Sequence, residues 1–271
     1  MQWTSEAIVL EVRAFSESSS LVTVLSEGYG LHNGLFRRGS VNLGDIVEAT
    51  WTARLPEQLG TWRFELKKSC IAFVMRDVDK IQCFKIFAAV LTEVLFEHLK
   101  CLDVYEAARN FINSFSSFYD LSRLDSAGCP GNSPQNELQR LLWNLLFVEL
   151  ALLPRVGVVL DFKDLVKASK HDPLEFVSPR TGRIVTRSMG EPYKDKLLAF
   201  PSLFLEDKEA EAEASGQNVF QLFNKRSLED LRKMFSLTHY FLFKSPNKSR
   251  TGNTISDFHR ASLAALLDTL P

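Results

Sequence analysis

The N-terminal third of the chain most constrains its fold, because short runs of β-branched and aliphatic residues alternate there with turn residues at an even spacing. Apolar and partly polar residues alternate in the first run, as expected for a half-buried strand. The five runs are 7–13, 21–26, 31–37, 46–52 and 62–73. Short strands at this spacing predict a small antiparallel barrel. An OB-type barrel fits the pattern, and an SH3-like barrel would produce nearly the same one.

The apolar period changes at Asp79 from two to three and four, which is typical of amphipathic helices. The expected helices cover 81–99, 104–118, 134–153, 228–242 and 258–270. Ser227 and Asp230 form a capping box at the start of the fourth. The stretch 156–205 is rich in Pro, Gly and Ser, and a small hairpin is expected at 178–185.

Together these patterns predict an α+β protein of more than one domain. The expected domains are an OB-fold barrel over residues 1–78 and a helical bundle over 79–271. The helical domain carries the inserted Pro- and Gly-rich region 156–205.

Composition points to the cytoplasm. No apolar run approaches the roughly 20 residues that cross a bilayer. The first six residues lack the features of a secretory signal. The cysteines are scattered singly and are expected to be small core residues in a reducing compartment: Cys70, Cys83, Cys101 and Cys129.

The sequence contains no recognisable catalytic motif. No G-x-S-x-G nucleophile motif is present, and neither a phosphate-binding loop nor a dinucleotide-binding glycine motif follows a strand. The five histidines stand apart from any candidate nucleophile. We therefore expect a binding protein rather than an enzyme, with no catalytic residue, cofactor or metal.

Basic residues on the predicted barrel are the candidate binding groups, although the net charge is −1. Arginine pairs phosphates bidentately and stacks on bases, so these side chains suit a nucleic acid. A solvated barrel edge is the other reading of the same residues. A second basic cluster lies in the expected hairpin. The candidates for DNA binding are Arg13, Arg37, Arg38, Arg54, Arg180 and Arg183.

With these residues in view, nearly the whole chain resembles the RecO family of bacterial recombination mediators in DNA repair. No single motif is decisive, but the order and spacing of the segments are specific. The segments that carry the resemblance are 6–10, 27–30, 34–39, 51–60, 176–183 and 237–242. The last three of these segments resemble those of alphaproteobacterial members.

The resemblance implies an N-terminal OB-fold, a helical C-terminal domain and a set of partners. The family binds single- and double-stranded DNA and anneals strands coated with single-strand-binding protein (SSB). With RecR it assists the loading of RecA, so RecA is an indirect partner. The implied place is the cytoplasm, in association with the nucleoid. Residues that could receive the SSB tail are Arg226, Arg232 and Lys233.

One departure concerns metal binding. Many family members carry cysteines in the inserted region, and some bind zinc, whereas the corresponding stretch 160–169 contains none. A closed structural zinc site needs four ligands, so no zinc is expected.

The alternative function, from a different class, is a protein–protein adaptor whose barrel and helices bind partners without touching DNA.

Overall fold

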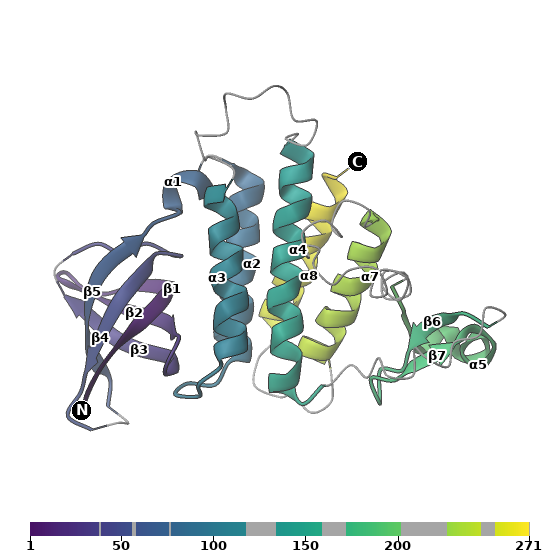
Figure 1. The fold of residues 1–271 in the computed structure, drawn as a ribbon, viewed down its shortest axis with the longest axis horizontal. Coiled ribbons are helices and arrows are strands. Elements are labelled where there is room, and N and C mark those ends of the chain that lie inside the picture. Colours follow the sequence, from purple (N-terminus) through teal and green to yellow (C-terminus); the bar gives the residue numbers. More distant parts are fainter. Residues whose placement is uncertain are drawn as a thin grey trace, which may run out of the picture. The chain divides into compact units, whose positions relative to one another are not determined.

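The computed structural model describes residues 1–37, 39–55, 58–75, 77–117, 134–158, 172–201, 227–244 and 253–270. Strands dominate the first part of the chain and helices the rest (Figure 1). The strands are β1 (Gln2–Ser16), β2 (Ser19–Ser26), β3 (Gly30–Arg37), β4 (Ile46–Thr52), β5 (Gly60–Lys68), β6 (Leu174–Val177), β7 (Ile184–Thr186) and β8 (Leu198–Ala199). The α-helices are α1 (Ile71–Val74), α2 (Val78–Val94), α3 (Leu102–Ser117), α4 (Pro134–Leu152), α5 (Arg187–Gly190), α7 (Leu228–His239) and α8 (Asn253–Asp268). The other helical turns are the 3₁₀ segments η2 (Leu153–Val156) and η4 (Glu191–Lys196) and the π segment η6 (Tyr240–Lys244).

The first five strands form a closed barrel in the order β1-β2-β3-β5-β4. β1 is long enough to pair with both β2 and β4, which closes the sheet on itself. β3 and β5 pair in parallel, and every other pair in the barrel is antiparallel. This is the strand order of an OB-fold, so the topology decides between the two barrel types that the sequence left open.

Valines, alanines and tryptophans fill the interior of the barrel. The inward-facing residues alternate along each strand, as the pleat requires, and the cluster includes Trp3, Trp51 and Trp62. Both large indoles from β4 and β5 are satisfied: Trp51 Nε1 donates to the Asn33 carbonyl at 3.2 Å and Trp62 Nε1 to the Val22 carbonyl at 3.0 Å. A Cβ at Gly60 would lie 2.2 Å from the Trp51 ring, so glycine there makes room for the indole.

The fifth strand ends earlier than its apolar run suggested. The sequence predicts strand through Phe73, but β5 ends at Lys68 and the short helix α1 begins at Ile71. The first turn of that helix buries Val74, so its apolar residues serve helix packing rather than the sheet. A short apolar run cannot by itself distinguish the two.

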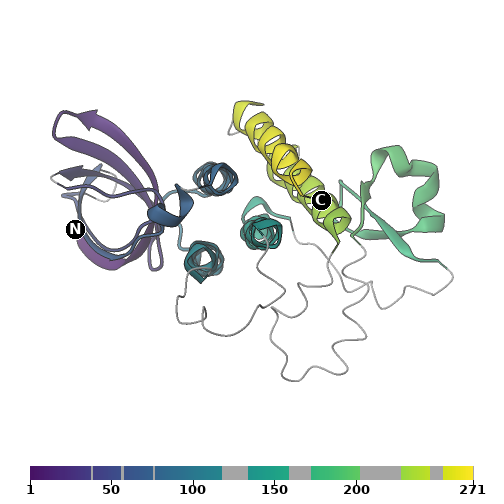
Figure 2. The ribbon, with the colours of Figure 1, turned by 90° about the horizontal axis from the view of Figure 1, so that it is seen from above.

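Helices α2, α3 and α4 pack against one another, and α2 also contacts β1 (Figure 2). Phenylalanines form the centre of this packing. Phe87 and Phe111 stack with ring centroids 4.5 Å apart, and Phe84 and Phe115 complete the group with tilted and edge contacts. All four side chains are buried.

A buried tyrosine ties α3 to the barrel. The Tyr105 hydroxyl donates to Glu6 Oε1 on β1 at 2.8 Å, and Arg109 Nε lies 3.3 Å from the same oxygen. Burial, together with the Glu6 carboxylate, raises the pKa of Tyr105 above its ordinary value. The phenol therefore stays protonated and remains a donor at any physiological pH.

We expect Tyr105→Phe to lower the free energy of unfolding by about 1–3 kcal/mol, because a hydrogen bond to a charged, partly buried acceptor is lost. Urea denaturation followed by circular dichroism measures this. Tyr240→Phe is the matched control, since the Tyr240 hydroxyl makes no hydrogen bond with the described residues. Equal midpoints for the two variants would contradict the assignment.

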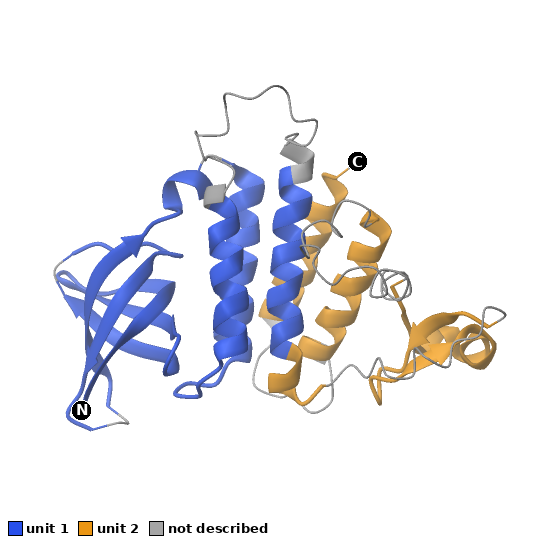
Figure 3. Ribbon diagram, viewed as in Figure 1, with its two compact units in different colours: residues 1–152 blue, residues 153–271 orange. Residues whose placement is uncertain are grey.

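The chain divides into two compact units, Met1–Leu152 and Leu153–Pro271 (Figure 3). The first unit holds the barrel and α1–α4. The second holds the small sheet β7-β6-β8 and the helices α7 and α8, which contact each other. The domain division at residues 78 and 79 remains a prediction. Ser227 is confirmed as the N-cap of α7: its Oγ accepts from the Asp230 backbone N–H at 3.0 Å and donates to Asp230 Oδ2 at 2.8 Å.

Candidate nucleic-acid interface

Strand register places three arginines on the outer surface of the barrel. Val22 of β2 faces the core, so its neighbour Leu21 faces outward, and residues opposite Leu21 share that side. Leu21 pairs with Arg13 of β1 on one side and with Leu35 of β3 on the other. Arg13 and Leu35 therefore face outward too. Two residues further along β3, Arg37 therefore also faces outward, opposite Ser19.

Arg63 of β5 joins this group. Phe36 and Trp62 are the last partners in the parallel β3–β5 ladder, and Arg37 and Arg63 are the next residues on these two adjacent strands. Strands in a ladder lie about 4.8 Å apart, which brings two guanidinium-bearing side chains together on one face. Both residues are exposed, and neither makes an ion pair with the part of the chain that the structure describes. We call the surface formed by Arg13, Arg37 and Arg63 the arginine face.

The other barrel arginines differ in their surroundings. Arg13 Nε lies 2.7 Å from Glu11 Oε1, so its charge is partly balanced. Arg54 is exposed in the loop between β4 and β5, without an ion-pair partner among the described residues. Arg38 lies outside the described residues. Arg63 was not among the residues predicted from the sequence. Its position between the inward-facing Trp62 and Phe64 of the same strand indicates that it faces outward.

The outer surface becomes acidic further along β5. Lys67 there lies between two carboxylates, 3.2 Å from Glu48 Oε1 and 3.7 Å from Glu6 Oε2. The hydrogen bond to Glu48 is the main reason that the pKa of Lys67 is raised. Arg37 and Arg63, which have no ion-pair partner among the described residues, therefore lie near the start of β5, and the paired Lys67 lies further along the strand.

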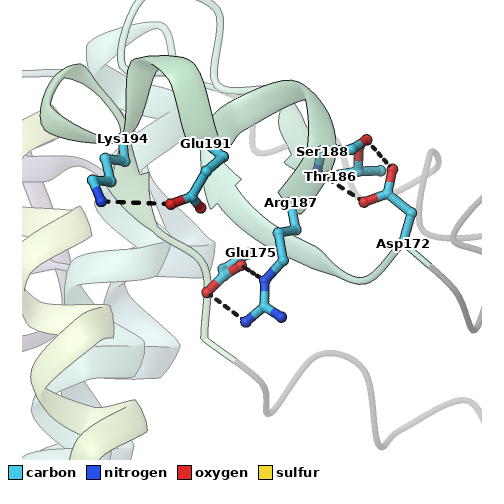
Figure 4. Close-up of polar contacts among 7 residues, drawn as sticks. All are labelled: Asp172, Glu175, Thr186, Arg187, Ser188, Glu191 and Lys194. Carbon is cyan, nitrogen blue, oxygen red and sulfur yellow. Dashed lines mark hydrogen bonds and ion pairs between the residues drawn. The ribbon is translucent and has the colours of Figure 1, made fainter.

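A hairpin is present in the second unit, but its bounds differ from the predicted 178–185. Its strands are β6 and β7, and most of the predicted stretch is the turn 178–183 between them. Arg180 and Arg183 lie on this turn, are exposed and make no ion pair with described residues. Two other cations of the same region are neutralised (Figure 4). Arg187 binds Glu175 through two hydrogen bonds, of 2.6 and 3.3 Å, and Lys194 lies 3.5 Å from Glu191.

An aspartate network holds this region together. The Asp172 carboxylate accepts from the Ser188 backbone N–H at 2.9 Å and from the Ser188 hydroxyl (Figure 4). These bonds lower the pKa of Asp172 below its usual value.

The stretch 160–169, on which the zinc prediction depends, lies outside the described residues.

The cations expected to receive a partner's acidic tail are already paired on α7 and α8. Arg232 donates to Asp268 Oδ1 at 3.0 Å and to the Leu267 carbonyl at 2.8 Å. Lys233 lies 2.6 Å from Glu229 Oε1, one helical turn away. Arg226 lies outside the described residues. Arg232 and Lys233 are therefore adjacent on α7, and the charge of each is paired with a carboxylate of this chain.

The opposite end of the barrel carries a histidine pair. The loop between α2 and α3 docks on β3, where the His98 backbone N–H donates to the Leu31 carbonyl at 2.9 Å and Asn33 Nδ2 donates to Glu97 Oε1 at 2.8 Å. This brings His98 Nδ1 to 2.8 Å from His32 Nε2. Burial, and then the neighbouring His98, lower the pKa of His32 to about 4.

The depressed pKa of His32 predicts a pH-dependent stability. Between pH 6.5 and about 4 the unfolded chain binds a proton at this position and the folded chain does not. Stability is therefore complete above pH 6.5 and falls as the pH is lowered toward 4. We expect His32→Gln to lose less stability over this interval than the wild type, measured by the shift of the melting temperature. A parallel pH dependence of the two proteins would contradict this.

The described cysteines are packed core residues. Cys70, Cys83 and Cys101 are buried, as the sequence predicts. Burial raises the pKa of Cys70 to about 12 and raises that of Cys83 as well. Nucleophilic cysteines have lowered rather than raised pKa values, so neither thiol has the character of a catalytic nucleophile. Cys129 lies outside the described residues.

A closed OB-fold barrel with an exposed arginine face places the chain in a class whose barrels bind oligonucleotides and oligosaccharides. Comparison with known proteins defines the family within that class. A family model described as "Recombination protein O N terminal" matches residues 1–69, which cover the barrel.

Curated relatives extend the match over most of the chain. The DNA repair protein RecO of Rhodospirillum centenum is 33% identical over 74% of this chain and 76% of its own length. The DNA repair protein RecO of Rhodopseudomonas palustris is 30% identical over 100% and 98%, and that of Ehrlichia chaffeensis is 27% identical over 99% of each. The chain belongs to the RecO family, which supports a role in DNA repair.

None of the helices in the described part of the chain combines the length and the apolar character that crossing a bilayer demands.

Proposed function

We propose that this protein is a recombination mediator that binds single-stranded DNA on the arginine face of its barrel. The observation that carries the proposal is the adjacent pair Arg37 and Arg63, exposed on β3 and β5 without an ion pair to described residues. Two unbalanced guanidinium groups on neighbouring strands repel each other unless an anion lies between them. Phosphates are the anions that arginine pairs bidentately.

The surrounding residues favour a polyanion over a single phosphate. Arg13 lies across β2 from Arg37, and Arg54 lies in the β4–β5 loop, so the cations follow the barrel surface over several strands. A nucleic acid backbone offers charges at regular spacing, and its counterions are released when several of them are neutralised together. Arg180 and Arg183 of the hairpin turn are a further candidate contact from the second unit.

Annealing follows from charge neutralisation. Two complementary strands repel through their phosphates, and a surface that screens this charge lowers the barrier to pairing. The proposed activity involves no bond making, so the protein is a mediator and not an enzyme. Family membership supports double-stranded DNA as a second ligand, SSB and RecR as partners and RecA as the protein that is loaded.

We place the SSB contact on the cations of α7. Arg232 and Lys233 are paired with Asp268 and Glu229, but the first pair is exposed and the second partly so. Exposed ion pairs contribute about 0–1 kcal/mol each, so an acidic tail can exchange for the intramolecular carboxylates at little cost. Arg226 is included in this proposal from the sequence alone.

The alternative function is a protein–protein adaptor whose barrel never contacts DNA. Fluorescence anisotropy of a labelled single-stranded oligonucleotide, titrated at several salt concentrations, separates the two. We expect binding whose affinity falls steeply with salt, with a log–log slope of about −0.7 for each phosphate contact. Absence of binding at low salt by the folded protein would favour the adaptor.

A further inference from the structure

A cavity of about 560 Å³ opens at the end of the barrel remote from Arg37. Its walls come from β1, from the β2–β3 turn, from β3 and β4 and from the α2–α3 loop, and they include Trp3, Tyr29, His32, Trp51, His98 and Lys100. The volume lies within the range of small-molecule sites, about 300–1,000 Å³. The proposed DNA surface uses none of these residues.

The cavity is built rather than incidental, because the α2–α3 loop is fixed on the barrel at several points. The backbone of the loop pairs with β3 at Leu31 and Glu97, and His98 contacts His32 through their ring nitrogens. Gly30 allows this close approach: it has φ +73°, and a Cβ there would lie 2.0 Å from the Leu99 carbonyl oxygen. Docking of the loop brings Lys100 to the cavity wall.

Three aromatic rings lie in nearly parallel planes from the core to the cavity. Trp51 is buried, and Trp3 stacks on it at a centroid distance of 6.0 Å and an interplanar angle of 23°. Tyr29 stacks on Trp3 at 4.2 Å and 17° and is 40% exposed. The series therefore ends in an accessible ring, where a further planar group would continue the stack.

The charge around the cavity favours a planar group that is joined to an anion. Lys100 contributes an exposed ammonium group, and no carboxylate lines the cavity among the described residues. Arg54 follows Ala53, whose carbonyl accepts a bond from the backbone nitrogen of Met1 at the cavity wall. The nearest acid of the docked loop, Glu97, is bonded to Asn33.

The position of the cavity relates it to the arginine face. β3 runs from Gly30 at the cavity to Arg37 at the arginine face, a span of about 23 Å at 3.3 Å per residue. Cations thus occur at both ends of this strand, Lys100 beside the cavity and Arg37 on the arginine face, which suits a chain with repeated negative charges.

We propose that this cavity binds one nucleobase of the single strand, stacked on Tyr29, while Lys100 contacts the adjoining phosphate. The inference rests on the proposed function and adds to it a base-binding site separate from the phosphate contacts. Every base has a π-face, so such a site tolerates any sequence.

The test compares two short single-stranded oligonucleotides of equal phosphate number, one with normal bases and one with abasic sugars throughout. Their affinities for the full chain are measured by anisotropy for the wild type, Tyr29→Ala and Tyr29→Phe. We expect Tyr29→Ala to weaken binding of the normal oligonucleotide about 10-fold, within the range for one base–aromatic stack. Binding of the abasic oligonucleotide should not change, and Tyr29→Phe should behave as the wild type.

Tyr193→Ala is the matched control, since Tyr193 is an exposed tyrosine of the second unit. A 2-aminopurine base in the oligonucleotide gives a second readout, because stacking quenches its fluorescence; the quenching should be lost in Tyr29→Ala. Equal losses for both oligonucleotides, or no loss for either, would overturn the base site while leaving the phosphate contacts standing. Failure of both oligonucleotides to bind the wild type would instead overturn the proposed function, and the base site with it.

An acidic peptide with an aromatic end is the competing ligand for such a cavity. If that peptide binds the wild type and not Tyr29→Ala, while normal and abasic DNA bind alike, the cavity is a protein-binding site and the proposal is wrong.

Discussion

Reversing both charges of the adjacent pair, in Arg37→Glu/Arg63→Glu, is expected to weaken binding of single-stranded DNA about 100-fold at low salt. We assign about 1.4 kcal/mol to each reversal, which is a factor of ten in affinity. The log–log salt slope should become shallower by about 1.4, because two phosphate contacts of about 0.7 each are lost. Anisotropy titrations at several salt concentrations measure both quantities.

The control for this variant must change the net charge equally. Lys85→Glu/Arg260→Glu does so, at exposed positions on α2 and α8 that have no ion-pair partner among the described residues. We expect this control to retain most of the affinity and nearly the same salt slope. If the two double variants lose affinity equally, the effect is one of overall charge and the arginine face is not the DNA site.

The second large effect is expected from Gly30→Ala, which should lower the free energy of unfolding by about 2–4 kcal/mol. Two costs add: the left-handed conformation, about 1–2 kcal/mol for a residue with a Cβ, and the clash with the Leu99 carbonyl 2.0 Å from that Cβ. Relief of the clash requires the α2–α3 loop to move from the barrel, so the His32–His98 contact should weaken as well. Thermal and urea denaturation measure the loss of stability.

Gly157→Ala separates the two costs. Gly157 also has a positive φ, of +78°, but nothing lies within 4 Å of a Cβ at this position. We expect it to cost about 1 kcal/mol, from the backbone conformation alone. A loss in Gly30→Ala no greater than that in Gly157→Ala would show that the loop does not press on β3.

The strands and helices could be predicted because their patterns are local. Alternation marks the five barrel strands, and the change to a period of three and four marks the start of α2 within a residue of Asp79. The barrel type could not be decided, because the parallel pairing of β3 with β5 depends on contacts between distant segments. The end of β5 was wrong for a related reason: an apolar run suits both a buried strand and a helix turn.

The candidate site was predictable in part. Exposed arginines beside strand ends are visible in the sequence, and Arg13, Arg37 and Arg54 are exposed on the barrel. Which cations are neutralised was not visible, since the acids that bind Arg187 and Arg232 lie 12 and 36 residues away. Arg63 became a candidate only when register placed it beside Arg37.

The aromatic cavity could not be predicted at all. Its rings come from Trp3, Tyr29 and Trp51, which are far apart in the sequence, and its wall is completed by a loop between two helices. Each aromatic residue considered alone is typical of an apolar core. Only the stacked arrangement, ending in an exposed ring, distinguishes a binding surface from packing.

Mapping the DNA contact by photo-crosslinking tests the central claim most directly. A single-stranded oligonucleotide carrying photoreactive thymine analogues is crosslinked to the full chain, and the modified peptides are identified by mass spectrometry. We expect crosslinks in the peptides of β1–β3 and of the segment from Arg54 to Phe64, and their loss in Arg37→Glu/Arg63→Glu. Crosslinks confined to residues 153–271, with none on the barrel, would contradict it.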